Sequence, residues 1–238
     1  MAFSIGTSAT VFEVDSLIIS DRAGNQIQLS ANDMRNLGFQ TSTQLSTMAM
    51  TVVPSDSRSF AGGNQNDRLD GSDGNDLMWG NVGNDTLRGG LGNDEMWGGS
   101  SSPSDDETGN DFLYGDAGDD RLEGENGNDT LDGGPGADRL SGGAGADRFM
   151  FGSLLTSGDK DVIVDFLPGT DKLVFGSGFT TVAVFTTSAP TTGSPAFIYD
   201  RMSGLLRYDP DGNGALAAIE IAMINGAPAL TATDFVFA

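Results

Sequence analysis

The chain contains no cysteine and no histidine, and these two absences exclude most familiar catalytic and metal chemistry. Without them there is no Cys or His nucleophile, no His general base, no Ser-His-Asp triad and no zinc site of the usual type. A G-x-S-x-G nucleophile motif is also missing. An enzyme would have to work through carboxylates alone. We therefore predict a protein that is not an enzyme.

Basic residues and long apolar runs are also scarce. The 12 Lys and Arg residues stand against 34 Asp and Glu, which gives a formal net charge of −22. This balance argues against nucleic acid and anionic membrane surfaces as partners, and it suits a polyvalent cation. No apolar run approaches the length of a transmembrane segment, and the first residues do not resemble a Sec-type signal peptide. Export would therefore need another route.

Glycine is abundant, and its 35 residues recur with a period of nine. From Gly62 the chain reads GGNQNDRLD, GSDGNDLMW, GNVGNDTLR and GGLGNDEMW, and it ends at Met150 with GDAGDDRLE, GENGNDTLD, GGPGADRLS and GGAGADRFM. A ninth copy begins at Gly98 and resumes at Gly109 after an insert rich in Ser and acids. Such a period predicts a repeat architecture. The alternative, a disordered linker, would not keep an apolar residue every ninth position.

Two positions of the repeat keep their chemistry in every copy. The eighth residue is apolar and is predicted to point inward from a very short strand. The sixth residue is aspartate, and it follows a glycine-rich turn whose backbone carbonyls crowd together. Calcium takes six to eight oxygen ligands from carboxylates and carbonyls, so two stacked turns would complete a site. The predicted ligands are Asp67, Asp76, Asp85, Asp94, Asp111, Asp120, Asp129, Asp138 and Asp147, with Gly62, Gly71, Gly80, Gly89, Asn66, Asn75, Asn84, Asn93, Asn110, Asp119 and Asn128 beside them.

The stack of aspartates predicts that folding depends on the cation. Carboxylates one strand spacing apart, about 4.8 Å, repel each other by about 0.9 kcal/mol in water and about 3.5 kcal/mol at an effective dielectric constant of 20. Each copy offers little apolar surface against this repulsion. We therefore expect metal binding and folding to be one event, satisfied by extracellular but not by cytosolic calcium.

The nonapeptide resembles the RTX (repeats-in-toxin) family, whose pattern GGxGxDxUx is a known calcium-binding repeat. The resemblance implies an all-β fold, a right-handed parallel β-roll with two nonapeptides per turn and several calcium ions between turns. The insert at residues 100–108 departs from the pattern, and so does Gln65 at a position that is otherwise glycine.

The resemblance continues beyond the repeats. Residues 161–173, DVIVDFLPGTDKL, look like the segment that closes the roll in secreted RTX proteins such as the serralysins, which implies that Asp161, Asp165 and Asp171 help to cap the last turn. The C-terminal TATDFVFA looks like the uncleaved type I secretion signal of that group. The zinc-protease motif of serralysins is absent.

The regions on either side of the repeats read as β-rich. We expect a small cap or assembly element over residues 1–60, with strands in VFEVDSLIISD and NQIQLS, the roll over 61–151, and a capping region over 152–238 with a hairpin formed by AFIYD and GLLRYD. The string DPDGNGALAAIE fits the EF-hand loop pattern in full. It could bind calcium through Asp209, Asp211, Asn213 and Glu220, or it could be a plain hairpin turn.

Outward aromatic residues suggest a contact surface. Trp79 and Trp97 both occupy the ninth position, one full turn of the roll apart, and should stack with Leu77 beside them. Phe112 and Tyr114 should point outward from the other sheet. Such a surface could be covered by the terminal segments, or it could form a subunit interface or a glycan platform.

These observations predict a secreted, calcium-binding RTX protein with a non-enzymatic structural, self-assembling or adhesive role at the cell surface or in the extracellular matrix. The alternative is an extracellular glycan-binding module or a small enzyme that depends on carboxylates.

Overall fold

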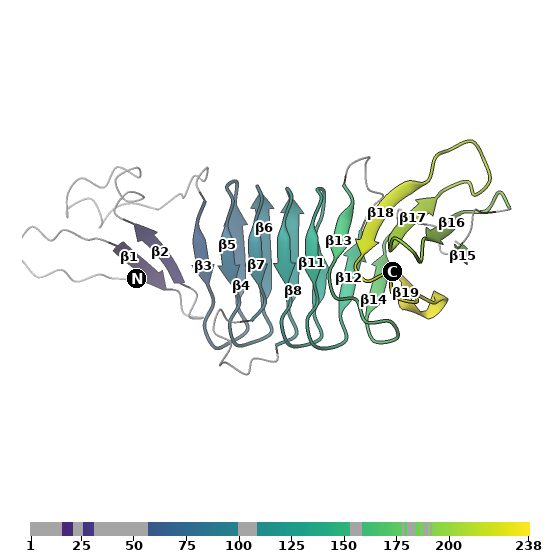
Figure 1. The fold of residues 1–238 in the computed structure, drawn as a ribbon. Helices are drawn as coiled ribbons and strands as arrows, with labels where there is room; N and C mark the ends of the chain where they lie inside the picture. Colours follow the sequence, from purple (N-terminus) through teal and green to yellow (C-terminus); the bar gives the residue numbers. More distant parts are fainter. Residues whose placement is uncertain are drawn as a thin grey trace, which may run out of the picture.

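The structure is a computed structural model, and it describes residues 16–20, 26–30, 57–99, 109–152, 159–177, 179, 184–187, 190 and 192–238. Its strands stand side by side in two facing sheets, with the chain's N-terminal hairpin at one end of the stack and the C-terminal region at the other (Figure 1). The one helical element among the described residues is a 3-10 turn, Ala232–Asp234. The predicted all-β class is confirmed.

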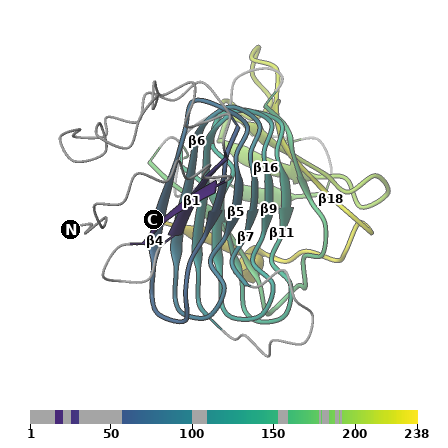
Figure 2. The ribbon, with the colours of Figure 1, turned by 90° about the vertical axis from the view of Figure 1, so that its left-hand side faces the viewer.

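The repeats form the middle of the twelve-stranded sheet, which we call sheet A, and run to one edge of the seven-stranded sheet, which we call sheet B; successive repeat strands alternate between the two. Strands within each sheet are parallel and in register, so that Leu87 of one coil pairs with Leu69 of the coil before it and Leu113 of the coil after it. This alternation is the predicted parallel β-roll. Figure 2 views the roll from its N-terminal end. Sheet A contains β3 (Ser59–Ala61), β5 (Leu77–Trp79), β7 (Glu95–Trp97), β9 (Arg121–Glu123), β11 (Arg139–Ser141) and β13 (Asp161–Ile163). Sheet B contains β4 (Arg68–Ser72), β6 (Thr86–Leu91), β8 (Phe112–Ala117), β10 (Thr130–Asp132), β12 (Arg148–Phe151) and β14 (Lys172–Phe175).

The core of the roll is a single column of side chains from each sheet. The eighth residue of every repeat is buried, as the alternation of the strand requires. Each nonapeptide therefore buries one large apolar side chain, and the rest of the repeat is turn. These residues are Leu69, Met78, Leu87, Met96, Leu113, Leu122, Leu131, Leu140 and Phe149.

The N-terminal hairpin extends sheet A. Strands β1 (Ser16–Ser20) and β2 (Gln26–Ser30) pair antiparallel, as the sequence predicts, and β2 pairs antiparallel with β3. The sequence also suggests a short helix that starts at residues 30–33 and runs through Leu37; apart from Ser30, which ends β2, these residues lie outside the described ones. The domain boundaries at residues 60 and 151 stay predictions, since sheet A runs across the first of them.

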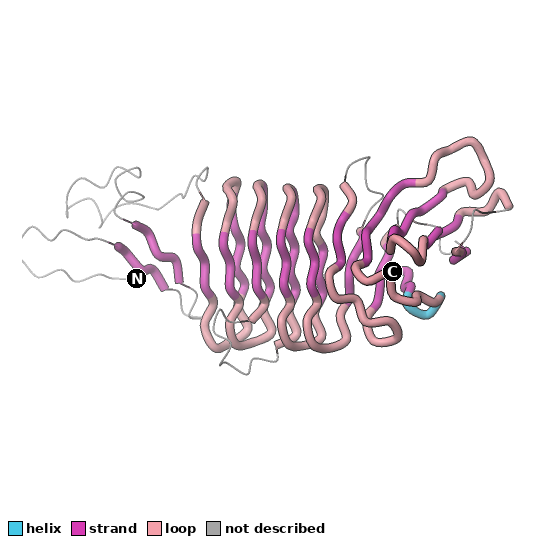
Figure 3. Tube along the Cα trace, viewed as in Figure 1, coloured by secondary structure: helices cyan, strands magenta, loops and turns pink. Residues whose placement is uncertain are grey.

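The C-terminal region closes the other end of the roll with mixed pairing. Sheet A continues from β13 through β18 (Ile219–Ile224), β17 (Leu205–Asp209), β16 (Ala196–Tyr199) and β15 (Val184–Thr186). Sheet B ends on β19 (Phe235–Phe237), which pairs parallel with β14. The predicted hairpin is confirmed as β16–β17. Figure 3 shows the regularly stacked coils of the roll giving way to a less regular arrangement of strands and loops in this region.

The C-terminal region has an aromatic core of its own. Phe175 lies within 4.4–5.2 Å, centroid to centroid, of Phe151, Phe179 and Phe197, and Phe197 lies 5.0 Å from Tyr208. Such rings bury far more apolar area per residue than the single leucine of a repeat. No helix in the described part of the chain is long and apolar enough to cross a membrane.

Candidate metal centre

The nine repeat aspartates form two ladders, one along the turns that precede each sheet. In each ladder, Oδ1 of one aspartate accepts the backbone N–H of the aspartate one coil earlier. Asp94, for example, accepts from Asp76 at 2.7 Å, and Asp120 accepts from Asp94 at 2.7 Å. Every repeat aspartate is at least 96% buried. The fold therefore places a column of carboxylates inside the turns.

The second oxygen of several of these carboxylates faces no donor. Oδ2 is buried and makes no hydrogen bond in Asp94, Asp120, Asp138 and Asp147. A buried carboxylate oxygen without a partner is costly, and in a native protein it calls for a missing partner such as an ion.

The first glycine of each repeat lines the space beside that oxygen. A Cβ at Gly89 would collide with Oδ2 of Asp94 and lie 2.6 Å from the carbonyl oxygen of Gly115, one coil further on. A Cβ at Gly124 would meet Oδ2 of Asp129 and would lie 2.6 Å from the carbonyl oxygen of Gly142. Only glycine leaves room for the two kinds of oxygen to converge. A carboxylate oxygen and a carbonyl oxygen from successive coils are the ligands that calcium prefers.

The fifth residue of the repeat forms a separate ladder of opposite direction. Oδ1 of Asn84 accepts the backbone N–H of Asn110 at 2.7 Å, and Oδ1 of Asn110 accepts that of Asn128 at 2.7 Å. These side chains are exposed, and their oxygens are already hydrogen-bonded to the next coil. The group that these residues could contribute to a cation site is therefore the backbone carbonyl. The same arrangement holds for Asn66, Asn75, Asn93, Asp119 and Asn128.

Burial raises the pKa of the ladder carboxyl groups. Desolvation is the main cause in each case, followed by backbone hydrogen bonds that lower the pKa and by neighbouring carboxylates that raise it. The pKa is raised to about 6 in Asp94 and Asp147 and to about 8 in Asp120. Without a cation, the roll therefore favours protonated carboxyl groups.

Asp161 and Asp171 extend the two ladders beyond the repeats. The backbone N–H of Asp138 donates to Asp161 at 3.1 Å, and that of Asp147 donates to Asp171 at 3.1 Å. Desolvation, with the charge of Asp138 nearby, also raises the pKa of Asp161. Asp165 instead accepts the N–H groups of Gly142 and Gly143 at 3.0 and 2.9 Å and caps the last turn of the roll from outside.

The ladders cross the insert without a change in spacing. Asp85 donates to Asp111 and Asp94 to Asp120 across 26 residues, at the same 2.7 Å that is found where the partners are 18 residues apart. The insert itself, residues 100–108, lies outside the described residues. Eight extra residues therefore leave the stacking of the aspartates on either side unchanged.

The EF-hand string at residues 209–220 forms the connection between β17 and β18 and has no flanking helices. Glu220 lies on β18 and forms an ion pair with Lys160 at 3.0 Å. Asp211 accepts the N–H of Leu216 at 3.1 Å, and Asp209 accepts that of Asp211 at 3.2 Å. Within the described residues no three acidic side chains gather closely enough to hold a metal, here or in the roll. The string thus lacks the flanking helices of an EF-hand, but Oδ1 of Asp211 is buried without a hydrogen-bond partner, so both calcium binding and a plain turn stay predictions here. Any site in the roll must draw on backbone carbonyls.

The outward aromatic residues lie where their spacing places them. Trp79 and Trp97 are stacked, with ring centroids 5.3 Å apart and planes 7° from parallel. The outer side of Trp97 is occupied by the Arg121 guanidinium, and its Nε1 donates to Glu123 at 3.2 Å. Leu77 is 36% exposed beside them. On sheet B, Phe112 is 46% exposed, and Arg88 lies over the Tyr114 ring at 4.2 Å.

Sequence reasoning missed how the C-terminus is attached to the ladders. Asp171 accepts the N–H of Leu167 at 2.7 Å, and Asp234 accepts the N–H of Gly169 in the same loop at 2.8 Å. Asp234 is fully buried and also accepts the N–H of Thr231 at 2.7 Å. The spacing T-x-x-D at residues 231–234 is a capping-box signal that accounts for the bond between Thr231 and Asp234, but it does not indicate the contact with Gly169.

Comparisons with known proteins agree with this geometry. The family model of the RTX calcium-binding nonapeptide repeat (4 copies) matches residues 61–96, 105–131 and 123–153. The middle of the chain therefore consists of RTX calcium-binding repeats, as its sequence predicts. No curated protein matches the chain by sequence.

Two solved structures are similar to this one in part. The AlgE6R2 subunit of the Azotobacter vinelandii mannuronan C5-epimerase is 25% identical, with 71% of this chain and 91% of that chain covered and a TM-score of 0.39. The AlgE6R3 subunit of the same enzyme is also 25% identical, with 74% and 81% covered and a TM-score of 0.32.

Calcium fits the site on three grounds. The oxygens are hard ligands of the kind it prefers, the free Oδ2 atoms are buried and lack donors, and the glycine carbonyls converge on them. A bound Ca²⁺ would neutralise the ladder charge. The residues that would hold it are repeat aspartates such as Asp94, Asp120 and Asp147 through Oδ2, and the first glycines through their carbonyls, whereas Oδ2 of Asp67 and of Asp76 already accepts a backbone N–H.

Proposed function

We propose that the protein is exported and folds around several calcium ions outside the cell, where it has a non-enzymatic structural or adhesive role. The observation that supports calcium-dependent folding most directly is the column of buried Oδ2 atoms without donors, such as those of Asp94, Asp120 and Asp138. Each lies beside a glycine that cannot be replaced without filling the space. Because each repeat buries a carboxylate and only one large apolar side chain, the stack needs the cation in order to fold.

The test is a change of one ladder carboxylate to its neutral isostere. Asp120→Asn keeps the Oδ1 acceptor for the Asp94 N–H but removes the charge beside Oδ2. We expect the calcium concentration at the midpoint of folding, followed by circular dichroism, to rise about tenfold or more. With chelator present, the same variant should show equal or greater β content than the wild type, because a buried charge is gone.

Asp73→Asn is the matched control. Asp73 is an exposed aspartate in a turn of the roll, and its replacement removes the same unit of charge. Its midpoint should stay within about twofold of the wild type. Equal midpoints for the two variants, or full β content of the wild type in chelator, would remove the basis of the proposal.

Export by a type I system is part of the same proposal. The C-terminal TATDFVFA ends in an acidic residue and a short apolar tail, and in the folded chain it forms β19 against β14. A tail bound in a sheet is not accessible, so the signal would be read before calcium folds the roll. A fusion of residues 179–238 to a passenger protein should be exported by cells that carry a type I system and retained by cells that lack it. Retention in both would contradict export by this route.

The structural role rests on the absence of catalytic equipment and on the aromatic surface of sheet A. Stacked indoles present their edges to solvent, whereas a sugar ring needs an exposed ring face. Trp79 is paired in the strand register with Ala61 on the side away from Trp97, and Arg121 lies over the Trp97 ring. A subunit contact along these edges thus agrees better with the geometry than a glycan platform does. Light scattering should show particles larger than the 24.6 kDa monomer in calcium and not in chelator; monomers in both would exclude self-assembly.

A further inference from the structure

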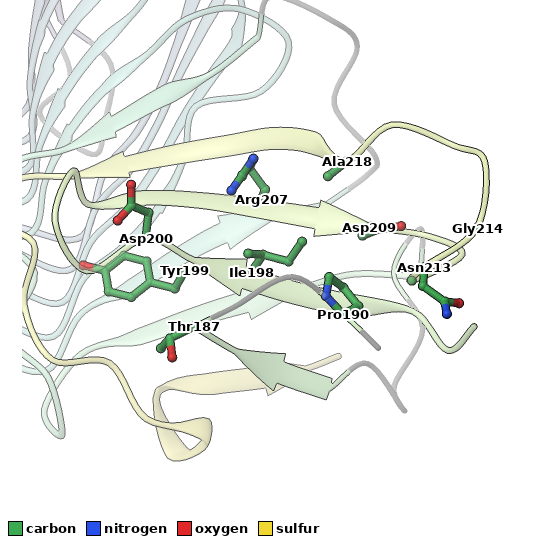
Figure 4. Close-up of a pocket in the computed structure, with 11 residues that line it drawn as sticks. Thr187, Pro190, Ile198, Tyr199, Asp200, Arg207, Asp209, Asn213, Gly214 and Ala218 are labelled. Atoms are coloured by element: carbon green, nitrogen blue, oxygen red, sulfur yellow. The ribbon is translucent and has the colours of Figure 1, made fainter. Parts of the chain in front are cut away.

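A cleft of about 450 Å³ lies on the C-terminal sheet, between the loop before β16 and the loop after β17 (Figure 4). Side chains alternate between the two faces of β16 and β17, and this alternation puts Phe197 and Tyr208 into the aromatic core. It puts Ile198 and Arg207, which are paired across the strands, on the opposite face, where both line the cleft. The cleft is distant in sequence from the calcium ladders and shares no residue with them.

Arg207 is an unusual residue in this cleft because its guanidinium makes no hydrogen bond or ion pair within the described residues, and only its charge acts on a neighbour, where it helps to lower the pKa of the Asp200 carboxyl group. Its Nε is buried and makes no hydrogen bond, and within the described residues Arg207 forms no ion pair. Glu220 is opposite Arg207 in the strand register, but its carboxylate pairs with Lys160. Among the described residues, the Arg207 guanidinium therefore forms no ion pair with an acidic side chain.

The acidic groups of the cleft, by contrast, already have donors. Asp200 accepts the N–H of Met202 at 2.9 Å and the hydroxyl of Ser203 at 2.7 Å. Asp209 accepts the N–H of Asp211 at 3.2 Å. Both oxygens of Asp200 and Oδ1 of Asp209 thus already accept hydrogen bonds, whereas the Arg207 guanidinium donates none within the described residues, so a ligand that pairs with Arg207 must bring an acceptor.

We propose that this cleft binds a small molecule through a carboxylate that pairs with the Arg207 guanidinium. The planar fork of an arginine side chain matches the two oxygens of a carboxylate. Ile198 and Ala218 provide apolar contact for the rest of the ligand, and Asn213 lies at the open end of the cleft. Asp200 and Asp209 favour the monoanionic carboxylate over the more highly charged phosphate monoester, because the repulsion grows with charge.

The test uses the full chain in calcium with three probes of similar size: gluconate, glucose 6-phosphate and glucose. Amide NMR shifts should move for residues 198–213 on addition of gluconate, with a dissociation constant of about 0.1–10 mM for one charge-assisted pair and limited apolar contact. Glucose 6-phosphate should bind more weakly, and glucose should leave the shifts unchanged. Equal binding of glucose, or no shifts with gluconate at about 20 mM, would overturn the proposal.

Arg207→Gln should weaken gluconate binding by about ten- to a hundredfold, since one charge-assisted pair is lost. Arg201→Gln is the matched control, because Arg201 is exposed on the adjacent turn and its replacement removes the same charge. It should change the affinity by no more than about twofold. Amide shifts of the aromatic core residues Phe197 and Tyr208 that match the wild type show that the strands beneath the cleft are intact in both variants. Unchanged affinity of a folded Arg207→Gln protein would contradict the role of this arginine.

Discussion

The roll and the C-terminal region are both built from β-strands, but different interactions stabilise them. In the roll, each nine-residue repeat buries one aliphatic or aromatic side chain and one carboxylate. In the C-terminal region, a cluster of rings around Phe175 and Phe197 fills the space between the sheets. Hydrophobic burial can support the second kind of packing alone, whereas the first leaves buried charge that only a cation or a proton can neutralise.

The difference shows why the two regions need each other. The roll is open at its end, and its last turns continue directly into β13, β14 and the Asp161 and Asp171 positions of the ladders. The aromatic region offers a preformed surface on which those turns can begin to stack. We infer that the order of folding runs from the C-terminal region into the roll as calcium binds.

Removal of calcium should produce the largest difference in stability between the roll and the C-terminal region. In chelator we expect fast hydrogen exchange throughout residues 61–151, because the charge of the ladder is uncompensated there. The amides of β16 and β17 should remain slower by at least about tenfold, since their core is aromatic. Hydrogen exchange with mass spectrometry, with and without calcium, gives the comparison. Uniform exchange of both regions in chelator would show that they form one cooperative unit.

Gly127→Ala should damage the roll more than any single side-chain deletion. Gly127 has φ of 142°, and an added Cβ would collide with the carbonyl oxygen of Gly109 in the coil before it. We expect a loss of more than about 3 kcal/mol in the calcium-loaded chain. Gly226→Ala is the control, because φ is 75° there and a Cβ would meet nothing within 4 Å. It should cost about 1 kcal/mol of unfolding free energy, measured by denaturant titration.

Phe197→Ala should destabilise the C-terminal region by about 3–5 kcal/mol, because the ring packs against Phe175, Phe179 and Tyr208. The loss should be the same at every calcium concentration that keeps the roll folded. Leu216→Ala, at a side chain that is 61% exposed, should change stability by less than about 0.5 kcal/mol. A loss that vanished at high calcium would mean that the ions, not the rings, stabilise this region.

A smaller effect is expected from pH in the absence of calcium. Desolvation raises the pKa of Asp94 and Asp147 to about 6 and that of Asp120 to about 8, above the ordinary value for aspartate. The metal-free roll thus binds more protons than the unfolded chain over the range between these values, so its stability falls as pH rises from about 4 to about 8. Circular dichroism of calcium-free protein should show more β content at pH 5 than at pH 8.

The same protons compete with calcium for the carboxylates. The calcium concentration at the midpoint of folding should therefore rise on acidification. If the β content without calcium did not depend on pH, both expectations would be contradicted.

The period of nine predicted a repeat architecture with buried eighth residues, because the same local pattern recurs in each copy. The parallel roll with two repeats per turn, and with it the stacked Trp79–Trp97 pair, came from the resemblance to RTX proteins. The hairpins β1–β2 and β16–β17 could be read from alternation and turn residues. The partner of Glu220 could not be predicted, because the sequence does not show that Lys160, 60 residues away, forms an ion pair with its carboxylate. The attachment of Asp234 to Gly169 was hidden for the same reason.

By itself, the sequence determined that the middle of the chain repeats, that aspartate and glycine recur at fixed places in it, and that calcium is the cation such turns suit. Those properties are local, and a nine-residue unit carries them wherever it occurs. Only the tertiary structure decided which oxygen of each aspartate bonds to the neighbouring coil and which one is left free. It also decided that Arg207 should stand unpaired in a cleft, because contacts between distant strands depend on how the sheets pack and not on the spacing along the chain.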